Sequence, residues 1–224
     1  VAYSKANVKM VGTHAGVGIG EDGYSQMGLE DLALMRSLHG VTVVQPADDV
    51  ETEAAVVWAA AHRGPVYLRL TRQKVERVNG PGYRFEPGRG VVLSDAPDKS
   101  LDVALFATGG PVAHALHAVE RLAAERVKAR AINIHTLNPI DRELVLDTAR
   151  RAAKIVTVED HAPHGGLFSA VAEVLAEAGA GVRVHRIAVE GFGESGSPEA
   201  LYAKHCLDAE GIYRRTAAFL RSGA

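Results

Sequence analysis

Short apolar runs and longer amphipathic segments alternate along the whole chain. Runs of four to five apolar residues are typical of buried strands, and apolar residues that recur at helical spacing are typical of helices packed on a sheet. In the first third, this pattern predicts strands at 8–12, 41–44 and 66–70. It predicts helices over 29–38 and about 50–62.

The same alternation continues more regularly in the second half. Strands are predicted at 103–108, 131–134, 155–158 and around 182–187, and helices over 112–123, 167–175 and about 208–220. Strands that alternate with helices of this length favour a parallel sheet covered on both faces. The fold class predicted is therefore α/β, with a mostly parallel sheet in the second half.

A change in residue type divides the chain into two domains. Residues 74–100 contain several Gly, Pro and Asp turn signals, so we interpret 76–100 as a linker with one short strand near 90–93. We expect a first domain at 1–75 and a second at 101–224. The first has only three clear strands and is shorter than the roughly 100–150 residues usual for a domain. We expect a preceding segment or another chain to complete its sheet.

Composition narrows the class of protein. The net charge is −2 and no Lys/Arg run stands out, which disfavours nucleic acid or an anionic membrane as a partner. No apolar run approaches the roughly 20 residues that a membrane-spanning helix needs. Cys206 is the only cysteine, which excludes an internal disulfide and a cysteine metal site. We therefore expect a cytoplasmic enzyme or enzyme subunit.

The loop that follows the first strand contains a sequence typical of dinucleotide-binding proteins. Residues 18–23 read Gly-Ile-Gly-Glu-Asp-Gly and match G-x-G-x-x-G between a strand and a helix. In that motif, backbone N–H groups face a pyrophosphate. Here Glu21 and Asp22 would repel the phosphates, and the acidic residue expected about 20 positions later is absent. We therefore reject a nucleotide site.

The same loop carries other polar side chains that could recognise a ligand. His14 opens it, Asp22 lies in its middle and Gln26 closes it. A loop at the carboxyl end of a parallel strand is where ligands bind in α/β sheets, and an imidazole, a carboxylate and an amide could hydrogen-bond a polyhydroxylated substrate. These side chains could equally cap the loop's own backbone. Spacing alone leaves both interpretations open.

Longer strings of residues resemble one family. Residues 13–36 read THAGVGIGEDGYSQMGLEDLALMR and closely resemble the transketolases, in the animal-type form that has Ser-Gln-Met after the G-E-D-G sequence. The resemblance continues along essentially the whole chain in QPAD, PVYLRLTR, HTLNPID, VTVEDH and FGESG, at 45–48, 65–72, 135–141, 156–161 and 192–196.

The resemblance implies a function and site residues. Transketolases use thiamine diphosphate with Mg²⁺ to move a two-carbon ketol unit from a ketose phosphate to an aldose phosphate, as in the pentose phosphate pathway. By resemblance, His14, Asp22 and Arg72 bind substrate: His14 near the sugar phosphate end, Asp22 at a hydroxyl, and Arg72 at the terminal phosphate. Gln26 contacts the cofactor's aminopyrimidine, where many bacterial and yeast members have histidine.

The resemblance also indicates that this chain is part of a larger active site. The family's catalytic glutamate, the aromatics that stack on the pyrimidine and the metal-binding motif for the diphosphate have no counterpart here. The chain then corresponds to the end of a pyrimidine-binding domain plus the C-terminal domain. We expect it to require an N-terminal transketolase portion or subunit and to form a dimer in the assembled enzyme.

Two other functions stay open at this point. One is a subunit of another thiamine-diphosphate enzyme, such as deoxyxylulose-phosphate synthase or the β subunit of a 2-oxoacid dehydrogenase. The other is a non-catalytic subunit that mediates assembly, although the joint presence of His14, Asp22 and Arg72 disfavours it. Arg69, three residues before Arg72 in an expected strand, should point to the opposite face and could serve as a control in mutagenesis.

Overall fold

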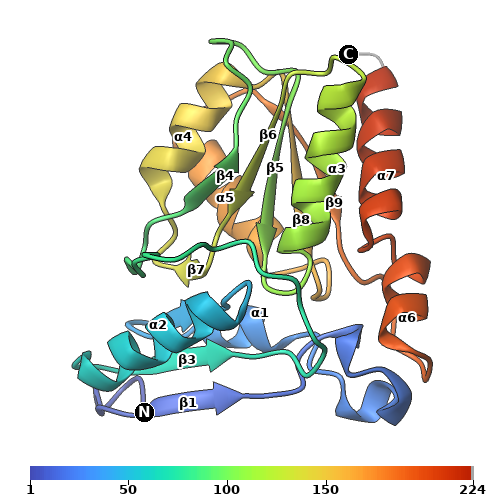
Figure 1. The fold of residues 1–224 in the computed structure, drawn as a ribbon. Coiled ribbons are helices and arrows are strands. Elements are labelled where there is room, and N and C mark those ends of the chain that lie inside the picture. The colour runs from blue at the N-terminus through green and yellow to red at the C-terminus, as the bar shows by residue number, and fades with distance from the viewer. Residues whose placement is uncertain (223–224) are drawn as a thin grey trace.

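A computed structural model describes residues 1–222 and contains two β-sheets, one above the other in Figure 1. The strands are β1 (Lys9–Gly12), β2 (Thr42–Val44), β3 (Val66–Arg69), β4 (Val91–Ser94), β5 (Val103–Thr108), β6 (Ala129–Asn133), β7 (Thr136–Asn138), β8 (Lys154–Glu159) and β9 (Arg183–Ile187). The helices are α1 (Asp31–Arg36), α2 (Asp49–Ala61), α3 (Val112–Ala124), α4 (Arg142–Arg151), α5 (Leu167–Glu177), α6 (Pro198–Lys204) and α7 (Ala209–Arg221). Two 3₁₀ segments, η1 (Val17–Asp22) and η2 (Tyr24–Gln26), lie in the glycine-rich loop.

The larger sheet has the order β4-β6-β5-β8-β9. Strands β6, β5, β8 and β9 are parallel, and β4 adds an antiparallel edge. Helices α3 and α7 pack together on one side, and α4 and α5 pack together on the other (Figure 1). The predicted α/β class with a mostly parallel sheet is therefore confirmed, and burial on both faces explains why the central strands β5 and β8 are mostly apolar.

The smaller sheet has the order β1-β3-β2-β7. Its first three strands are parallel, and β7 pairs antiparallel with β2. Strand β7 belongs to the second half of the chain, so the two halves share this sheet. Apart from β7, the chain passes from the smaller sheet to the larger one between β3 and β4, close to the predicted linker, and the domain boundaries stay a prediction.

Three elements were absent from the sequence-based prediction: β7, α4 and α6. Strand β7 has three residues, too few for a period to be recognised. Helix α6 is also short, yet Ser197 caps its N-terminus by accepting a hydrogen bond from the Ala200 N–H, and Pro198 occupies its first turn. Asp141 caps α4 in the same way through the Leu144 N–H. These caps are sequence signals that could have located both helices.

Two buried carboxylates of the α2 region fix part of the predicted linker. Asp48 caps α2 and also accepts hydrogen bonds from the N–H groups of Val78 and Asn79, both at 2.8 Å. Glu51 accepts from the Tyr83 hydroxyl at 2.5 Å and from the Asn133 amide of β6. The segment between the sheets is therefore held to both of them over this stretch.

His135, between β6 and β7, couples stability to pH. The side chain is buried, and its ring lies 4.5 Å from the ring of Phe85. Burial lowers the pKa of His135 to about 4, whereas an unfolded histidine titrates near 6.5. The unfolded chain therefore binds more protons than the folded chain between these values, and stability is lost as the pH falls through this window.

We expect His135→Gln to make the protein less sensitive to acid. Between pH 7 and pH 5 the free energy of unfolding should fall by about 2 kcal/mol less in this variant than in the wild type, because glutamine does not titrate. Urea unfolding at both pH values measures the difference, with the exposed His39→Gln as control. Equal pH dependence in the wild type and His135→Gln would contradict the expectation.

Candidate functional site

The residues that the sequence singled out lie at the carboxyl ends of the three parallel strands. The loop with His14, Asp22 and Gln26 follows β1, Gln45 follows β2, and Arg72 follows β3. Because parallel strands end at the same edge of a sheet, the segments that follow β1, β2 and β3 lie together along one edge of the smaller sheet. This is the edge where α/β sheets bind ligands.

The glycine-rich loop adopts a conformation that depends on glycine at several positions. Gly16, Gly20 and Gly23 have φ angles of 77°, 81° and 80°, which side chains rarely adopt. His14 is also left-handed, with φ of 63°. The loop therefore has a defined backbone conformation, and this conformation leaves the side chains of Asp22 and Gln26 exposed at the surface.

Arg72 and Asp22 meet in an ion pair. An Arg72 guanidinium nitrogen lies 2.9 Å from Asp22 Oδ2, and both side chains are about half exposed, at 51% and 48%. An exposed pair of this kind contributes only about 0.2–1 kcal/mol. A charge-assisted contact to a bound anion contributes about 1.5–3 kcal/mol, so Arg72 can exchange Asp22 for a ligand.

His14 and Gln26 are exposed on the same loop. The His14 Nδ1 lies 2.7 Å from the Thr13 hydroxyl, which leaves Nε2 free of this contact. Gln26 ends η2, where its backbone N–H donates to Gly23 O. The structure thus joins Arg72 to Asp22 directly, and places His14 and Gln26 on the loop that carries Asp22.

Arg69 is unsuitable as a neutral control for Arg72. Its side chain is 1% exposed, pairs with Asp31 at 2.8 Å and donates to the carbonyl oxygen of Gly28. Tyr67 donates a further hydrogen bond to Asp31. Burial alone would raise the pKa of Asp31, but the Arg69 charge and these hydrogen bonds outweigh it and hold that pKa below its usual value. Substituting Arg69 would disturb the support of the loop.

Asp160, which the sequence did not mark as functional, contacts the loop from the larger sheet. It follows β8 and is fully buried. Its carboxylate accepts hydrogen bonds from the N–H of Val17 at 2.8 Å and of Gly18 at 3.4 Å. These N–H groups lie at the G-x-G-x-x-G sequence, so a carboxylate of the protein occupies them where a nucleotide-binding loop would hold phosphate.

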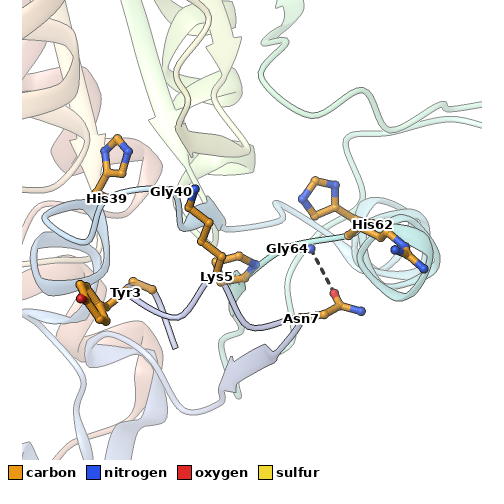
Figure 2. A pocket seen from close by; sticks show the side chains of 10 residues that line it. Tyr3, Lys5, Asn7, His39, Gly40, His62 and Gly64 are labelled. Atoms are coloured by element: carbon orange, nitrogen blue, oxygen red, sulfur yellow. Dashed lines mark hydrogen bonds between the residues drawn. The ribbon is translucent and has the colours of Figure 1, made fainter.

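A large cavity lies at the opposite, amino end of the smaller sheet. Its volume is about 1060 Å³, and its lining includes Lys5 and Asn7 before β1, His39 before β2, and His62 and Arg63 before β3. Figure 2 shows Asn7 of this cavity accepting a hydrogen bond from the Gly64 N–H. Since His14, Asp22 and Arg72 follow the strands, this cavity is separate from the candidate site.

Comparisons with known proteins point to the same family in both halves of the chain. Residues 1–77 match the pyrimidine binding domain of transketolase, and residues 72–212 match the transketolase C-terminal domain. The chain belongs to the transketolase family. The structure also resembles a solved split-gene transketolase titled as an inactive β4 tetramer, with a TM-score of 0.87 and 42% identity over 98% of this chain and 70% of that one.

The relatives of this chain include proteins named as sections or subunits of a transketolase and proteins named as transketolases. A protein of Methanocaldococcus jannaschii named as a transketolase C-terminal section is 39% identical over 96% of this chain and 67% of its own length. A 6-deoxy-6-sulfo-D-fructose transketolase subunit from a Clostridium species is 39% identical over 96% of this chain and 65% of its length. Human transketolase is 38% identical over 94% of this chain and 34% of its length. The chain thus spans about two thirds of the first two and about one third of the third.

The residues present fit only part of a thiamine diphosphate site. Gln26 offers an exposed amide that can both donate and accept a hydrogen bond toward an aminopyrimidine ring. Within residues 1–222, no group of three or more His, Cys, Asp or Glu side chains is arranged to hold a metal ion. The described residues therefore offer one amide suited to such a ring and no set of ligands for a diphosphate-bound metal. Over the same residues, no helix is long and apolar enough to cross a membrane.

Proposed function

We propose that this chain is the substrate-binding part of a thiamine-diphosphate-dependent transketolase that transfers a two-carbon ketol unit from a ketose phosphate to an aldose phosphate. The ion pair between Arg72 and Asp22 carries the proposal. It brings together a cation suited to a sugar phosphate and a carboxylate suited to a sugar hydroxyl, at the carboxyl edge of the sheet. The carbohydrate chemistry of the pentose phosphate pathway needs such a site.

Each side chain of the site has a defined task in this proposal. The guanidinium of Arg72 leaves Asp22 and pairs with two oxygens of the terminal phosphate. Asp22, released from Arg72, accepts a hydrogen bond from a substrate hydroxyl. His14 contributes an imidazole near the sugar phosphate end. Thiamine diphosphate, when bound, supplies the nucleophilic carbon to which the ketol unit is transferred, and Gln26 hydrogen-bonds its aminopyrimidine without titrating near neutral pH.

The partner in this proposal is an N-terminal transketolase portion that holds the diphosphate, Mg²⁺ and the catalytic glutamate, and the assembled enzyme is a cytoplasmic dimer of such pairs. Two observations support a partner. The chain matches about two thirds of a relative named as a transketolase subunit, and the similar split-gene chain was solved as an inactive tetramer of one chain type.

The test is to purify the chain with the polypeptide that accompanies it and to assay ketol transfer with thiamine diphosphate and Mg²⁺. We expect transfer between sugar phosphates only when both polypeptides are present. A complex that binds cofactor but acts on 2-oxoacids instead would favour the alternative thiamine-diphosphate subunits. A complex inactive with either substrate class would favour an assembly role.

We expect the chain alone to bind thiamine diphosphate weakly. Calorimetric titration of residues 1–224 with cofactor and Mg²⁺ should give little heat, because Gln26 is only one of the contacts that the cofactor needs. The same titration of the assembled complex is the positive control. Tight binding by the isolated chain would show that its own residues hold the diphosphate, which contradicts the proposed division of the site.

A sulfonated sugar is the second candidate substrate. The Clostridium relative is named for 6-deoxy-6-sulfo-D-fructose. A guanidinium such as that of Arg72 can pair with a sulfonate as well as with a phosphate, since both present oxygens in a similar arrangement. Comparing kcat/KM for the phosphorylated and the sulfonated ketose with the assembled enzyme separates the two substrates.

A further inference from the structure

The glycine-rich loop, residues 13–27, is held to the second half of the chain by two buried side chains, Asp160 and Tyr202. Asp160 accepts from the N–H groups of Val17 and Gly18, and the Tyr202 hydroxyl donates to the same carboxylate at 3.0 Å. Tyr202 lies on α6, which packs against η1 of the loop (Figure 1). Both side chains come from the second half of the chain.

The loop has few backbone hydrogen bonds to replace these contacts. Its first residues are tied to the smaller sheet by Ala15 N–H to Leu70 O and Gly16 N–H to Gly28 O. The next N–H groups, at the start of the 3₁₀ segment η1, have no carbonyl partner within that segment. Asp160 accepts from two of them. The start of the loop conformation that exposes Asp22 therefore depends on a carboxylate supplied from the end of a strand of the larger sheet.

The fit between Asp160 and the loop is tight enough to require glycine. A Cβ atom on Gly16 would lie 2.1 Å from Asp160 Oδ2, and Gly16 also has φ of 77°. On the next turn, a Cβ on Gly20 would lie 2.9 Å from Pro198 of α6. The loop thus follows the surface formed by Asp160 and α6 without room to shift.

Tyr202 also reaches the segment that carries Arg72, since its hydroxyl and the Gln73 amide both lie beside Gly110. The side chain of Gln73 interacts with the Tyr202 hydroxyl. It fills the space beside Gly18 and Gly110, since a Cβ on either would come within 2.7 Å of a Gln73 side-chain atom. Tyr202 is therefore linked on one side to the loop of Asp22, through Asp160, and on the other side to Gln73, the neighbour of Arg72.

We propose that Asp160 and Tyr202 are positioning residues that set Asp22 relative to Arg72, and that the C-terminal half of the chain thereby controls the affinity for the sugar phosphate. The inference rests on the proposed transketolase function. It assigns this half a role in substrate recognition although Asp160 and Tyr202 are buried and need not touch the substrate. Displacing either one moves the loop and Gln73 apart, and the phosphate and hydroxyl contacts no longer match one substrate.

The test uses Tyr202→Phe and Asp160→Asn in the assembled enzyme. Tyr202→Phe removes the hydroxyl with its contacts to Asp160 and Gln73 and keeps the ring. Asp160→Asn keeps the shape of the side chain but replaces one acceptor oxygen by an NH₂ group. The single oxygen that remains cannot accept all the hydrogen bonds from the loop and from Tyr202. For each variant we expect KM for the sugar phosphate to rise about tenfold, with a much smaller change for an unphosphorylated ketol and in kcat.

Hydrogen exchange of the full chain gives a readout that is independent of activity. We expect amides of residues 13–27 to exchange faster in both variants, while amides of β5 and β8 keep the wild-type rate. The control is Val145→Ala, which loses core packing on α4, in a cluster of buried residues that includes none of residues 13–27.

The outcomes separate the inference from the proposed function. Faster loop exchange with a selective rise in KM supports the inference. Unchanged loop exchange, or the same KM change in a Val145→Ala enzyme of equal melting temperature, overturns it. If the wild-type complex transfers no ketol unit, the proposed function fails, and unchanged KM in an active enzyme counts against the inference alone.

Discussion

Arg72→Ala should lower the preference for phosphorylated over unphosphorylated substrates by about 10- to 100-fold. A charge-assisted bidentate contact contributes about 1.5–3 kcal/mol, and each 1.4 kcal/mol corresponds to a factor of ten. The loss should be specific for the phosphate because the bond given up to Asp22 is an exposed one of little energy. Steady-state kcat/KM for both substrate types in the assembled enzyme measures it.

Arg77→Ala is the matched control for this experiment. Arg77 is also exposed and also pairs with a single aspartate, Asp49, outside the candidate site. It should leave the phosphate preference unchanged. A purely local role for Arg72, in which it only holds Asp22 in place, predicts a different result: Arg72→Ala and Asp22→Asn would then reduce turnover of both substrate types in parallel.

Arg69→Ala should destabilise the protein by about 3–5 kcal/mol. The substitution leaves the carboxylate of Asp31 partly buried without its cation and removes the donor to Gly28 O, and breaking a buried ion pair typically costs this much. The free energy of unfolding in urea at pH 7 measures the effect. The Arg69–Asp31 pair supports the loop through the contact of Arg69 with Gly28 O. Activity should therefore fall together with stability, and to the same extent for all substrates.

The double variant Arg69→Met with Asp31→Leu separates the charge from the packing. Replacing both charges by apolar side chains removes the unpaired carboxylate, so it should recover a large part of the lost stability. Two results would show that this ion pair does not support the loop. One is a loss of less than about 1 kcal/mol in the free energy of unfolding of Arg69→Ala. The other is a double variant that is less stable than Arg69→Ala.

The secondary structure was largely predictable because it depends on short-range pattern. The strands around 103–108 and 155–158 are mostly apolar, and α3 has its apolar residues on one face, so period and length located them. Helices α4 and α6 escaped because their apolar stripes are short or weak, and their caps, Asp141 and Ser197, were the better signal. Strand β7 escaped because its pairing partner, β2, lies about ninety residues away.

The position of Arg69 shows where the sequence was insufficient. From strand alternation we expected the side chains of Arg69 and Arg72 to point to opposite faces of the sheet. Alternation says nothing about which of these faces is covered by other parts of the protein. In the folded protein β3 lies between β1 and β2 and is buried along its length, so Arg69 is enclosed and must be paired. Whether an arginine in a strand meets solvent or a buried aspartate depends on what covers that strand, which no local pattern records.

By itself, the sequence determined the α/β class, the order of most helices and strands, and the loop and strand ends that carry His14, Asp22, Gln26 and Arg72. These follow from periodicity and from motifs, which are local along the chain. Only the tertiary structure decided that Arg72 pairs with Asp22, fifty residues earlier, and that Asp160 holds Val17, 143 residues earlier. Contacts of this kind form when distant segments pack together, so they are fixed by the geometry of the whole fold and leave no spacing in the sequence.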